Sequence, residues 1–391
     1  MEIEEGEIID LFELHYSDLS SSTSTKVDSI MEALGATGPG LLAITGVPNL
    51  CRSYLLPLAR KLALLDHETR KRILKEHNLG SDVPLRNPDR SVSSFAAQLK
   101  YSNSHCDSGA KFDSFENLGS AFRELGFCMM ELGLCLARVC DKAIGGNDLE
   151  QSLLESCAAK GRLIHYHSHL DAILLNERSK TSSKRGVKSM KPLLGSECKS
   201  IANDANLWQQ WHYDYGIFTV LTAPLFLTPS CLETSSAEGS LCWEQCPSPT
   251  GHTCLQIYDP NKKRVFRVRA PPESFIIQVG ESADIISKGK LRSTLHSVYR
   301  PSKFENLSRE TFVVFLQPAW TKTFSVSDYP RCLVASDDGQ QFEKDENELS
   351  HEIQKIVPPL SSRLRDGMTF AEFSRETTKQ YYGGSGLQSN R

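Results

Sequence analysis

Three residues with metal-binding side chains occur at a spacing that metal chemistry can use. His212 and Asp214 are separated by one residue, shortly before the apolar run Ile217–Thr222. On an extended strand alternate side chains point to the same face, so this imidazole and this carboxylate would lie side by side. His296 lies in a second strand-like segment, 294–299. Two histidines and one carboxylate leave coordination positions open, which suits a non-haem Fe(II) that binds O₂ and a cosubstrate.

A second pair of polar residues occurs in a later strand-like segment. Arg309 and Thr311 again alternate, in a stretch that is otherwise apolar up to Leu316. A guanidinium that points into a protein interior requires an anion. Its planar fork, next to a hydroxyl group, suits a carboxylate. The pair therefore predicts a binding site for an acidic group near the metal.

These motifs resemble the plant-type branch of the 2-oxoglutarate- and Fe(II)-dependent dioxygenases, which includes isopenicillin N synthase, anthocyanidin synthase and the gibberellin oxidases. That family's pattern is His-x-Asp, a distal His and then Arg-x-Ser. Three flanking segments are also similar to family motifs, namely 38–48, Arg162–Tyr166 and 280–290. The resemblance covers about residues 8–320 and is most specific over 211–318.

The resemblance implies two sets of site residues, which are the iron ligands His212, Asp214 and His296 and the 2-oxoglutarate contacts Arg309, Thr311 and Tyr166. It implies no catalytic group beyond the metal ligands. The implied reaction hydroxylates or desaturates a small molecule, consumes 2-oxoglutarate and O₂, and releases succinate and CO₂. Ascorbate is the reductant that such an enzyme would use.

The sequence departs from the family pattern at several points. Thr311 stands where Ser is usual, which keeps the hydroxyl. Ser297 follows the distal histidine where the family has Arg, and the spacing from His296 to Arg309 is longer than usual. The loops 171–210 and 229–251 are enlarged. Because they border the expected pocket, they prevent the transfer of any relative's substrate to this chain.

Two other functions remain open. A non-catalytic binding protein derived from this family would keep the jelly roll without turnover. A zinc-dependent hydrolase on a jelly roll would also use two histidines and a carboxylate. The complete ligand set argues against the first alternative, and Arg309 has no evident task in the second.

The expected fold class is α+β, with a double-stranded β-helix (jelly roll) core flanked by N-terminal and C-terminal helices. Seven short strand-like runs with polar turns between them predict the core. They are 161–167, 217–222, 253–258, 265–269, 275–279, 294–299 and 311–316.

Four regions are expected along the chain, namely an N-terminal α/β region at 1–112, a long core helix at 113–145, the jelly roll at 160–320 and a C-terminal helical extension with a disordered end at 321–391. In the first region, 27–34 and 54–76 favour helices, 41–44 favours a strand, and 80–112 reads as irregular. The apolar stripe from Phe115 to Val139 favours a helix that lies on a sheet over a coiled-coil seam. Segment 176–189 reads as a mobile loop, while 347–356 and 370–381 favour helices.

Composition limits the partners and the compartment. The 391 residues contain 44 basic and 48 acidic side chains, well mixed, with a net charge of −4. This gives no basic footprint for nucleic acid. No apolar run reaches the ~18 residues that suggest a membrane helix, and the acidic start Met1–Glu5 does not resemble a secretory signal. A monomer in the cytoplasm, with entry to the nucleus by diffusion, is expected.

Two further clusters of metal-binding residue types require separate interpretation. The twelve cysteines are scattered and read as reduced thiols. Among Cys231, Cys242, Cys246, His252 and Cys254 only one Cys-x₃-Cys spacing occurs, so a solvated insertion is favoured over a structural zinc site. His165, His167 and His169 alternate along one expected strand, and for two of the three flanking the pocket is favoured over ligation. For Tyr213 and Phe218, lining the substrate cavity and packing in the core are equally compatible with the sequence.

Overall fold

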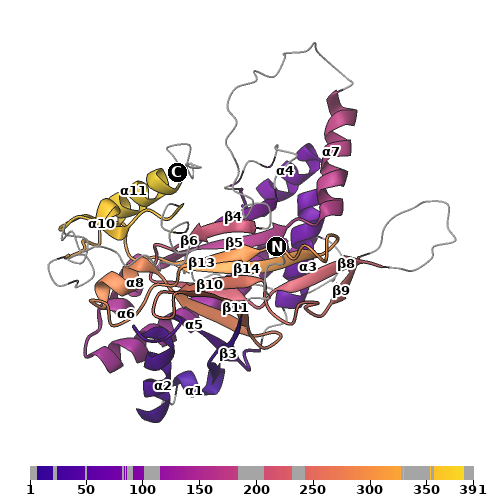
Figure 1. Ribbon diagram of the computed structural model, residues 1–391. Helices are drawn as coiled ribbons and strands as arrows, with labels where there is room; N and C mark the ends of the chain where they lie inside the picture. Colours follow the sequence, from indigo (N-terminus) through magenta and orange to yellow (C-terminus); the bar gives the residue numbers. More distant parts are fainter. Residues whose placement is uncertain are drawn as a thin grey trace, which may run out of the picture.

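The computed structural model consists of two facing β-sheets with helices on the outer side of the larger sheet (Figure 1). It describes residues 7–20, 24–48, 51–81, 83, 85, 91–100, 115–183, 207–230, 243–326, 329, 353 and 356–382. These residues include every expected metal ligand and every expected 2-oxoglutarate contact.

The larger sheet has nine strands, seven of them in the order β2-β3-β12-β7-β14-β5-β4, with β8 and β9 paired at the end of β14. Its strands are β2 (Glu13–His15), β3 (Leu41–Thr45), β4 (Val92–Lys100), β5 (Ala158–Tyr166), β7 (Phe218–Thr222), β8 (Leu225–Pro229), β9 (Trp243–Cys246), β12 (Phe275–Val279) and β14 (Ser308–Leu316).

The smaller sheet has five strands in the order β1-β11-β10-β13-β6. They are β1 (Ile8–Asp10), β6 (Leu207–His212), β10 (Leu255–Asp259), β11 (Arg264–Arg269) and β13 (His296–Tyr299). From β5 onward the chain crosses repeatedly between the sheets: β5, β7, β8, β9, β12 and β14 lie in the larger one, and β6, β10, β11 and β13 in the smaller one. Because of this alternation, residues far apart in the sequence face each other across the gap between the sheets.

Helices cover the outer face of the larger sheet. The long helix α5 (Leu118–Ile144) buries the stripe predicted from the sequence against β7 and β14, so the interpretation as a core helix is confirmed. Beside it lie α2 (Ser24–Leu34) and α3 (Cys51–Leu64). The remaining helical elements are α1 (Tyr16–Ser20), α4 (His67–Glu76), the short turn η1 (Phe115–Asn117), α6 (Asp148–Ser156), α7 (His169–Ser183), α8 (Glu281–Ile286), α10 (Leu360–Arg363) and α11 (Phe370–Tyr382).

Two apolar cores follow from this layering. One lies between the larger sheet and the helices, where Phe122 of α5 meets Phe312 of β14 edge to face, with ring centroids 4.7 Å apart. The other lies between the two sheets and includes Ile164, Leu221 and Val313 from the larger sheet and Ile257 from the smaller one. Alternate residues of β5 and β14 therefore point either to the helices or into the space between the sheets.

Four local predictions are wrong. Segment 80–112 is not irregular throughout, because β4 pairs along the whole length of β5 and buries Phe95 and Leu99 beneath the helices. The expected helix 54–76 is two helices, because Asp66 accepts a hydrogen bond from the Thr69 backbone and starts α4.

The two enlarged loops are also more ordered than predicted. Segment 176–189 is helical as far as Ser183, and 184–189 lies outside the described residues. Loop 229–251 contributes β9, which pairs with β8. Of the two C-terminal helices expected, 370–381 is confirmed as α11, while most of 347–356 and the end of the chain after residue 382 lie outside the described part.

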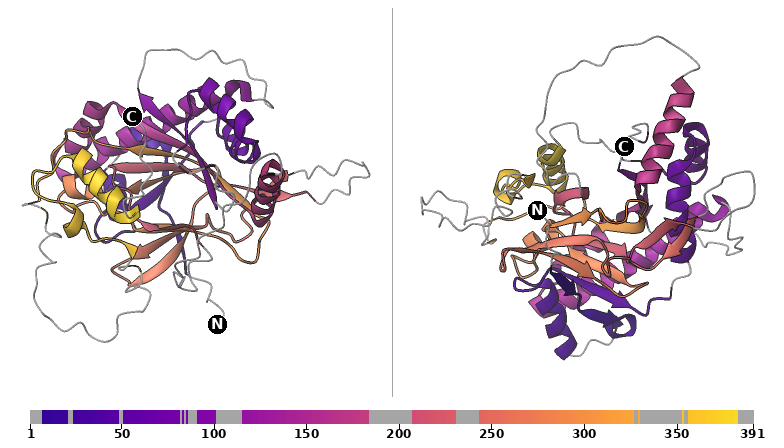
Figure 2. Two further views of the ribbon diagram at one scale, coloured as in Figure 1. Left: turned by 90° about the horizontal axis from the view of Figure 1, so that it is seen from above. Right: turned by 45° about the vertical axis from the view of Figure 1, so that its right-hand side comes forward.

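The C-terminal helices α10 and α11 lie at one end of the molecule, and α7 lies at the other end (Figure 2).

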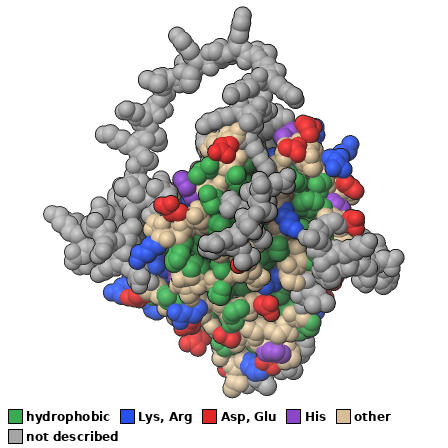
Figure 3. Space-filling view, turned by 90° about the vertical axis from the view of Figure 1, so that its right-hand side faces the viewer, with side chains coloured by type: hydrophobic (Ala, Val, Ile, Leu, Met, Phe, Trp, Pro, Cys, Tyr) green, Lys and Arg blue, Asp and Glu red, His purple; other side chains and the backbone are tan. Residues whose placement is uncertain are grey.

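Within the described residues, no helix is both long and apolar enough to cross a lipid bilayer. On the face shown in Figure 3, acidic and basic side chains are interspersed, as the well-mixed charges of the sequence predict.

Candidate metal centre

Neighbouring strands of the smaller sheet bring the two histidines together. His212 ends β6 and His296 begins β13, and the two are register partners in this antiparallel pair. Directly opposed residues on such a pair hold their side chains within contact distance. The imidazole centroids lie 4.2 Å apart.

Asp214 is positioned by the loop that leaves β6. The Asp214 carbonyl accepts a hydrogen bond of 2.8 Å from the backbone N–H of Glu281, at the start of α8. A β-carbon on Gly280 would lie 3.0 Å from the same carbonyl, so the close approach of the two segments requires glycine at this position. The loop is therefore fixed by backbone contacts to the start of α8.

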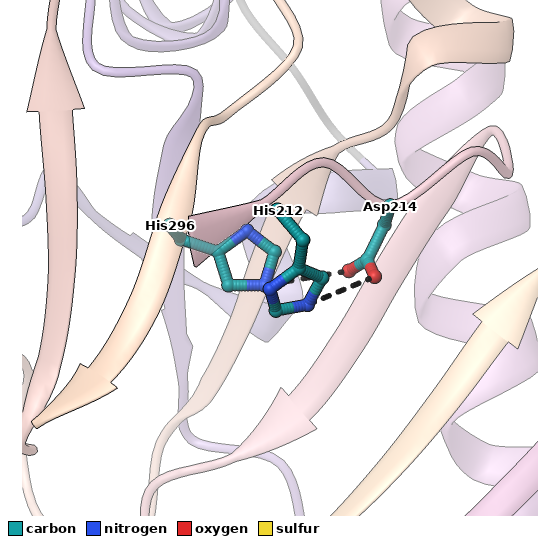
Figure 4. Close-up of side chains that lie close together, drawn as sticks. All are labelled: His212, Asp214 and His296. Atoms are coloured by element: carbon teal, nitrogen blue, oxygen red, sulfur yellow. Dashed lines mark ion pairs between the residues drawn. The ribbon is translucent and has the colours of Figure 1, made fainter. Parts of the chain in front are cut away.

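The three side chains converge on one point between the sheets (Figure 4). One ligand atom from each of His212, Asp214 and His296 lies within 4.8 Å of the others. Asp214 Oδ1 is 3.8 Å from His212 Nε2, and Asp214 Oδ2 is 3.8 Å from His296 Nε2. It is the only such group of three among the described residues. The His-x-Asp and distal histidine motif thus forms one cluster.

Hydrogen bonds assign the tautomer of both histidines. His212 Nδ1 donates to the Gln210 carbonyl at 2.8 Å, and His296 Nδ1 donates to the Thr294 carbonyl at 3.0 Å. Each Nε2 then carries the lone pair, which accepts a hydrogen bond from a glutamine amide: His212 Nε2 from Gln209 Nε2 at 3.0 Å and His296 Nε2 from Gln278 Nε2 at 3.2 Å. In metal sites, too, an outer hydrogen bond to Nδ1 orients the ligand. Burial and the nearby His296 lower the pKa of His212 to about 4, so this imidazole is neutral, as a metal ligand must be.

Outer residues hold the carboxylate ionised and oriented. Asp214 Oδ2 accepts hydrogen bonds of 2.7 Å from Thr219 Oγ1 and of 2.7 Å from Gln278 Nε2. Burial alone would raise the pKa of Asp214, but the two histidines and these hydrogen bonds lower it. Gln209 Nε2 lies 3.0 Å from His212 Nε2. Neither Gln209 nor Gln278 belongs to a motif, and the sequence prediction missed both.

Arg309 lies on the inner face of the larger sheet, at the start of β14. Its side chain is 1% exposed, and its Nε donates to the Thr253 carbonyl at 3.0 Å. Its Nη1 is buried and has no hydrogen-bond partner among the described residues. A buried guanidinium nitrogen without an acceptor is costly, which indicates that an anion belongs there.

Tyr166 and Thr311 adjoin this arginine. Tyr166 is the register partner of Arg309, and the guanidinium lies 4.9 Å from the centroid of its ring. The Tyr166 hydroxyl donates to Gln209 Oε1 at 3.0 Å, which links Arg309 through two side chains to His212. The Thr311 hydroxyl donates to the Thr222 carbonyl at 3.1 Å. The structure thus brings Arg309, Tyr166 and Thr311 to the inner face of the sheet that the metal cluster faces.

The alternating histidines at and just after the end of β5 do not belong to the metal cluster. His165 points to the helices, where its Nδ1 lies 2.9 Å from both carboxylate oxygens of Glu310 and its Nε2 lies 3.3 Å from Asp171 Oδ2. Asp171 also pairs with Arg60 at 2.7 Å. His167 bonds to Ser93, and His169 begins α7. His165 thus belongs to a buried network on the far side of the sheet, behind Arg309 and Tyr166, and does not flank the pocket. The prediction that two of the three histidines flank the pocket stays a prediction for His167 and His169.

The buried network predicts a pH dependence of stability. Burial opposes the charged imidazole, but Glu310 and Asp171 outweigh it and raise the pKa of His165 to about 9. A folded-state pKa above the unfolded value of about 6.5 gives stability that is complete below pH 6.5 and is lost as the pH rises through 9. We expect the free energy of unfolding to fall by on the order of 3 kcal/mol across this window. His165→Gln should flatten that slope in urea titrations at pH 6.5 and 9.5, whereas an unchanged slope would contradict the assignment.

The other candidate residues are placed as follows. Cys231 and Cys242 lie outside the described residues, so the zinc alternative stays untested there. The structure describes Cys246, His252 and Cys254, and these three residues form no metal-binding group by themselves. Phe218 is fully buried in the core beneath the helices and does not line the inner face. Tyr213 packs against residues of the C-terminal segment, and its backbone N–H donates to the Tyr381 hydroxyl at 3.2 Å.

Comparison with known proteins finds relatives by structure alone. No family model and no curated protein sequence matches the chain. A full-length Neurospora crassa protein, solved with α-ketoglutarate and thymine, matches with a TM-score of 0.54 at 15% identity, over 95% of this chain and 97% of that one. JOX2, solved with 2-oxoglutarate, Fe and JA, matches with a TM-score of 0.54 at 14% identity, over 95% and 86%. The chain has the fold of the 2-oxoglutarate- and Fe(II)-dependent oxygenases.

A plant enzyme shares this oxygenase fold. The dioxygenase for auxin oxidation 1 of Arabidopsis thaliana, solved with 2-oxoglutarate, matches with a TM-score of 0.50 at 17% identity, over 79% of this chain and 92% of that one. The residues at the centre of the present chain fit the groups bound in these structures. Two imidazoles and one carboxylate suit Fe(II), and the buried Arg309 Nη1 suits a carboxylate.

Proposed function

We propose that this chain is an Fe(II)- and 2-oxoglutarate-dependent dioxygenase that oxidises a small molecule. The observation that carries the proposal is the combination of two features in the space between the two sheets, one on each sheet. His212, Asp214 and His296 present three ligand atoms within 4.8 Å of one another, and Arg309 presents a buried N–H without an acceptor among the described residues. A metal site with open positions next to an anion site is what a chelating keto acid requires.

The same proposal includes the jelly roll. The alternation of β5 to β14 between the two sheets is the strand arrangement expected of a double-stranded β-helix. Its support is the likeness of the whole chain to solved oxygenases of this type.

Each part of the site has a distinct task. His212, Asp214 and His296 would hold the iron, with Thr219 and Gln278 orienting the carboxylate. Arg309, stacked on Tyr166 and close to Thr311 on the same strand face, would bind the distal carboxylate of 2-oxoglutarate. The bound iron supplies the activation of O₂ that no side chain can provide. The apolar surface between the sheets keeps water away from this chemistry.

Two rival functions are less well supported. A zinc hydrolase leaves the buried Arg309 without a task. A non-catalytic binding protein has no need for a neutral His212 or for a carboxylate held by two outer hydrogen bonds. The molecules bound in the solved relatives, thymine in the Neurospora crassa protein and JA in JOX2, support a small molecule as substrate without identifying it.

Turnover of the cosubstrate tests the proposal. Purified protein with Fe(II), ascorbate and 2-oxoglutarate should release succinate in air, and a fraction of a plant metabolite extract that contains the substrate should stimulate the release. Omission of Fe(II) should abolish it. Succinate formation that is independent of Fe(II), or none with any fraction, would contradict an active dioxygenase.

A further inference from the structure

One side chain bridges the metal cluster and the anion site. Gln209, on β6, donates from its amide Nε2 to His212 Nε2 at 3.0 Å, and its Oε1 accepts from the Tyr166 hydroxyl at 3.0 Å. Tyr166 in turn faces Arg309, whose guanidinium lies 4.9 Å from the centroid of the tyrosine ring. Both ends of one amide are therefore engaged, one at a metal ligand and the other at a residue of the anion site.

The orientation of the Gln209 amide follows from its partners. Because the pKa of His212 is lowered, its imidazole is neutral and has one N–H. That proton is on Nδ1, since Nδ1 lies 2.8 Å from the Gln210 carbonyl, which can only accept. His212 Nε2 is then an acceptor, so the group that faces it must be the NH₂ of Gln209. The amide oxygen is left to accept from the Tyr166 hydroxyl.

An irregularity of β6 aims Gln209 and His212 at the same side of the sheet. In a regular strand, residues three apart point to opposite faces. Here His296 pairs with His212 and Val298 pairs with Gln209, so three steps along β6 match two steps along β13. An extra residue of this kind turns a side chain to the other face, as β-bulges near active sites do. Gln209 therefore points into the space between the sheets, beside the metal ligand.

The amide hydrogen bond and a metal bond at His212 exclude each other. The Nε2 lone pair is what a neutral imidazole protonated at Nδ1 offers to a metal ion. In the structure that lone pair accepts from the Gln209 amide. A metal ion can therefore bind to His212 only if the amide leaves. Gln209 is half-buried and lies on an edge strand of the smaller sheet, so its flexible side chain can move away.

We propose that Gln209 couples the metal site to the 2-oxoglutarate site. When its amide gives up the His212 lone pair to a metal ion, its hold on the Tyr166 hydroxyl is released. The hydroxyl then donates to the acid beside Arg309, whose buried Nη1 has no hydrogen-bond partner among the described residues. Each ligand thereby favours binding of the other, beyond the effect of direct chelation. This inference rests on the proposed function and adds to it the residue that links the two sites.

Gln278 contacts the cluster in a different way. Its Nε2 lies 3.2 Å from His296 Nε2 but only 2.7 Å from Asp214 Oδ2. Its shorter hydrogen bond thus goes to the anionic ligand, and an outer bond that orients a ligand raises metal affinity. The two glutamines should therefore act in opposite directions, since Gln209 competes with the metal and Gln278 supports it.

Anaerobic Fe(II) titration against a competing chelator tests the competition. Gln209→Ala should bind Fe(II) about 2- to 10-fold more tightly than the parent, because one neutral hydrogen bond no longer opposes binding. Gln278→Ala should bind Fe(II) about 10- to 100-fold more weakly. Damage to the fold would weaken Fe(II) binding, so an increase in Gln209→Ala cannot come from misfolding.

The same titration with saturating 2-oxoglutarate tests the link. The acid should raise the Fe(II) affinity of the parent and of Gln209→Ala, because chelation is possible in both. The factor should be about 2- to 10-fold smaller in Gln209→Ala, since this variant has no amide to release.

A matched control separates this effect from a general effect of glutamine loss. Gln256 on β10 of the same sheet is also half-buried, and its Oε1 accepts from Ser297 Oγ at 3.2 Å. Its strand neighbours Leu255 and Ile257 are buried in the core between the sheets, so Gln256 faces away from that core. Gln256→Ala should match the parent in both titrations.

Two results would overturn the inference. One is an Fe(II) affinity of Gln209→Ala that equals that of the parent or lies below it. The other is an equal effect of 2-oxoglutarate on the Fe(II) affinity of the two proteins. If 2-oxoglutarate does not raise the Fe(II) affinity of the parent at all, the proposed function itself is wrong; if it raises both affinities equally, only the link through Gln209 is wrong.

Discussion

Asp214→Ala is expected to lose high-affinity Fe(II) binding and all 2-oxoglutarate turnover while the protein stays folded. Asp214 is the only anionic member of the cluster, and its two oxygens face the two histidines at 3.8 Å each. Removal of a residue that merely orients a ligand costs about 10- to 100-fold in metal affinity, so removal of the ligand itself should cost at least about 100-fold. Anaerobic Fe(II) titration with a competing chelator measures this change.

The matched control is an exposed carboxylate. Asp148, in the first turn of α6, is exposed, and Asp148→Ala should bind Fe(II) like the unmodified protein. If Asp214→Ala retains the Fe(II) affinity of the parent, Asp214 is not a ligand and the cluster has another purpose.

Arg309→Ala is expected to lose 2-oxoglutarate affinity on the order of 100-fold and to leave Fe(II) affinity unchanged. The reason is geometric: among the described residues, the Arg309 guanidinium contacts Tyr166 and the Thr253 carbonyl and forms no hydrogen bond to a metal ligand. Calorimetric titration of 2-oxoglutarate into the iron-loaded protein gives the first value, and the chelator competition gives the second.

A conservative variant sharpens the test of this clamp. Arg309→Lys keeps the charge but removes the planar fork, so its affinity for 2-oxoglutarate should lie between those of the parent and Arg309→Ala. Equal affinity in all three proteins would show that the acid binds elsewhere. A parallel loss of Fe(II) in Arg309→Ala would show that the fold around the site has changed.

The members of the metal cluster were predictable from their residue types and spacing, but the strand geometry expected for His212 and Asp214 is only half correct. β6 ends at His212, and Asp214 lies in the loop that follows, where backbone contacts to the start of α8 position it. The strand-like segment around His296 supplied the third residue. That His296 would lie opposite His212 depends on the pairing of β6 with β13, a contact between distant segments. The resemblance to a known family, not the spacing, supplied that pairing.

The residues that the sequence prediction missed act through tertiary contacts. Gln278 reaches Asp214 across the gap between the sheets, and Gln209 bridges Tyr166 and His212. Glutamine carries no motif, so nothing local marks either residue. The surroundings of His165 were not predicted, because Glu310 and Asp171 come from a strand and a helix that only the tertiary fold brings to it.

Two of the strands that the sequence analysis did not predict, β4 and β9, were missed for a similar reason. β4 has weak apolar alternation, and its pairing with β5 places it in the sheet. β9 lies in a polar segment that the sequence presented as a loop, and its only strand partner in the described part of the chain is β8.

The visible absorption of the anaerobic complex tests the central claim most directly. Purified protein with Fe(II) and 2-oxoglutarate should develop the charge-transfer band of a keto acid chelated to iron, and Asp214→Ala should not develop it. A band in the parent protein that disappears in Asp214→Ala is the result we predict. A parent protein that binds Fe(II) but shows no band with saturating 2-oxoglutarate would contradict the assignment of this cluster as a dioxygenase centre.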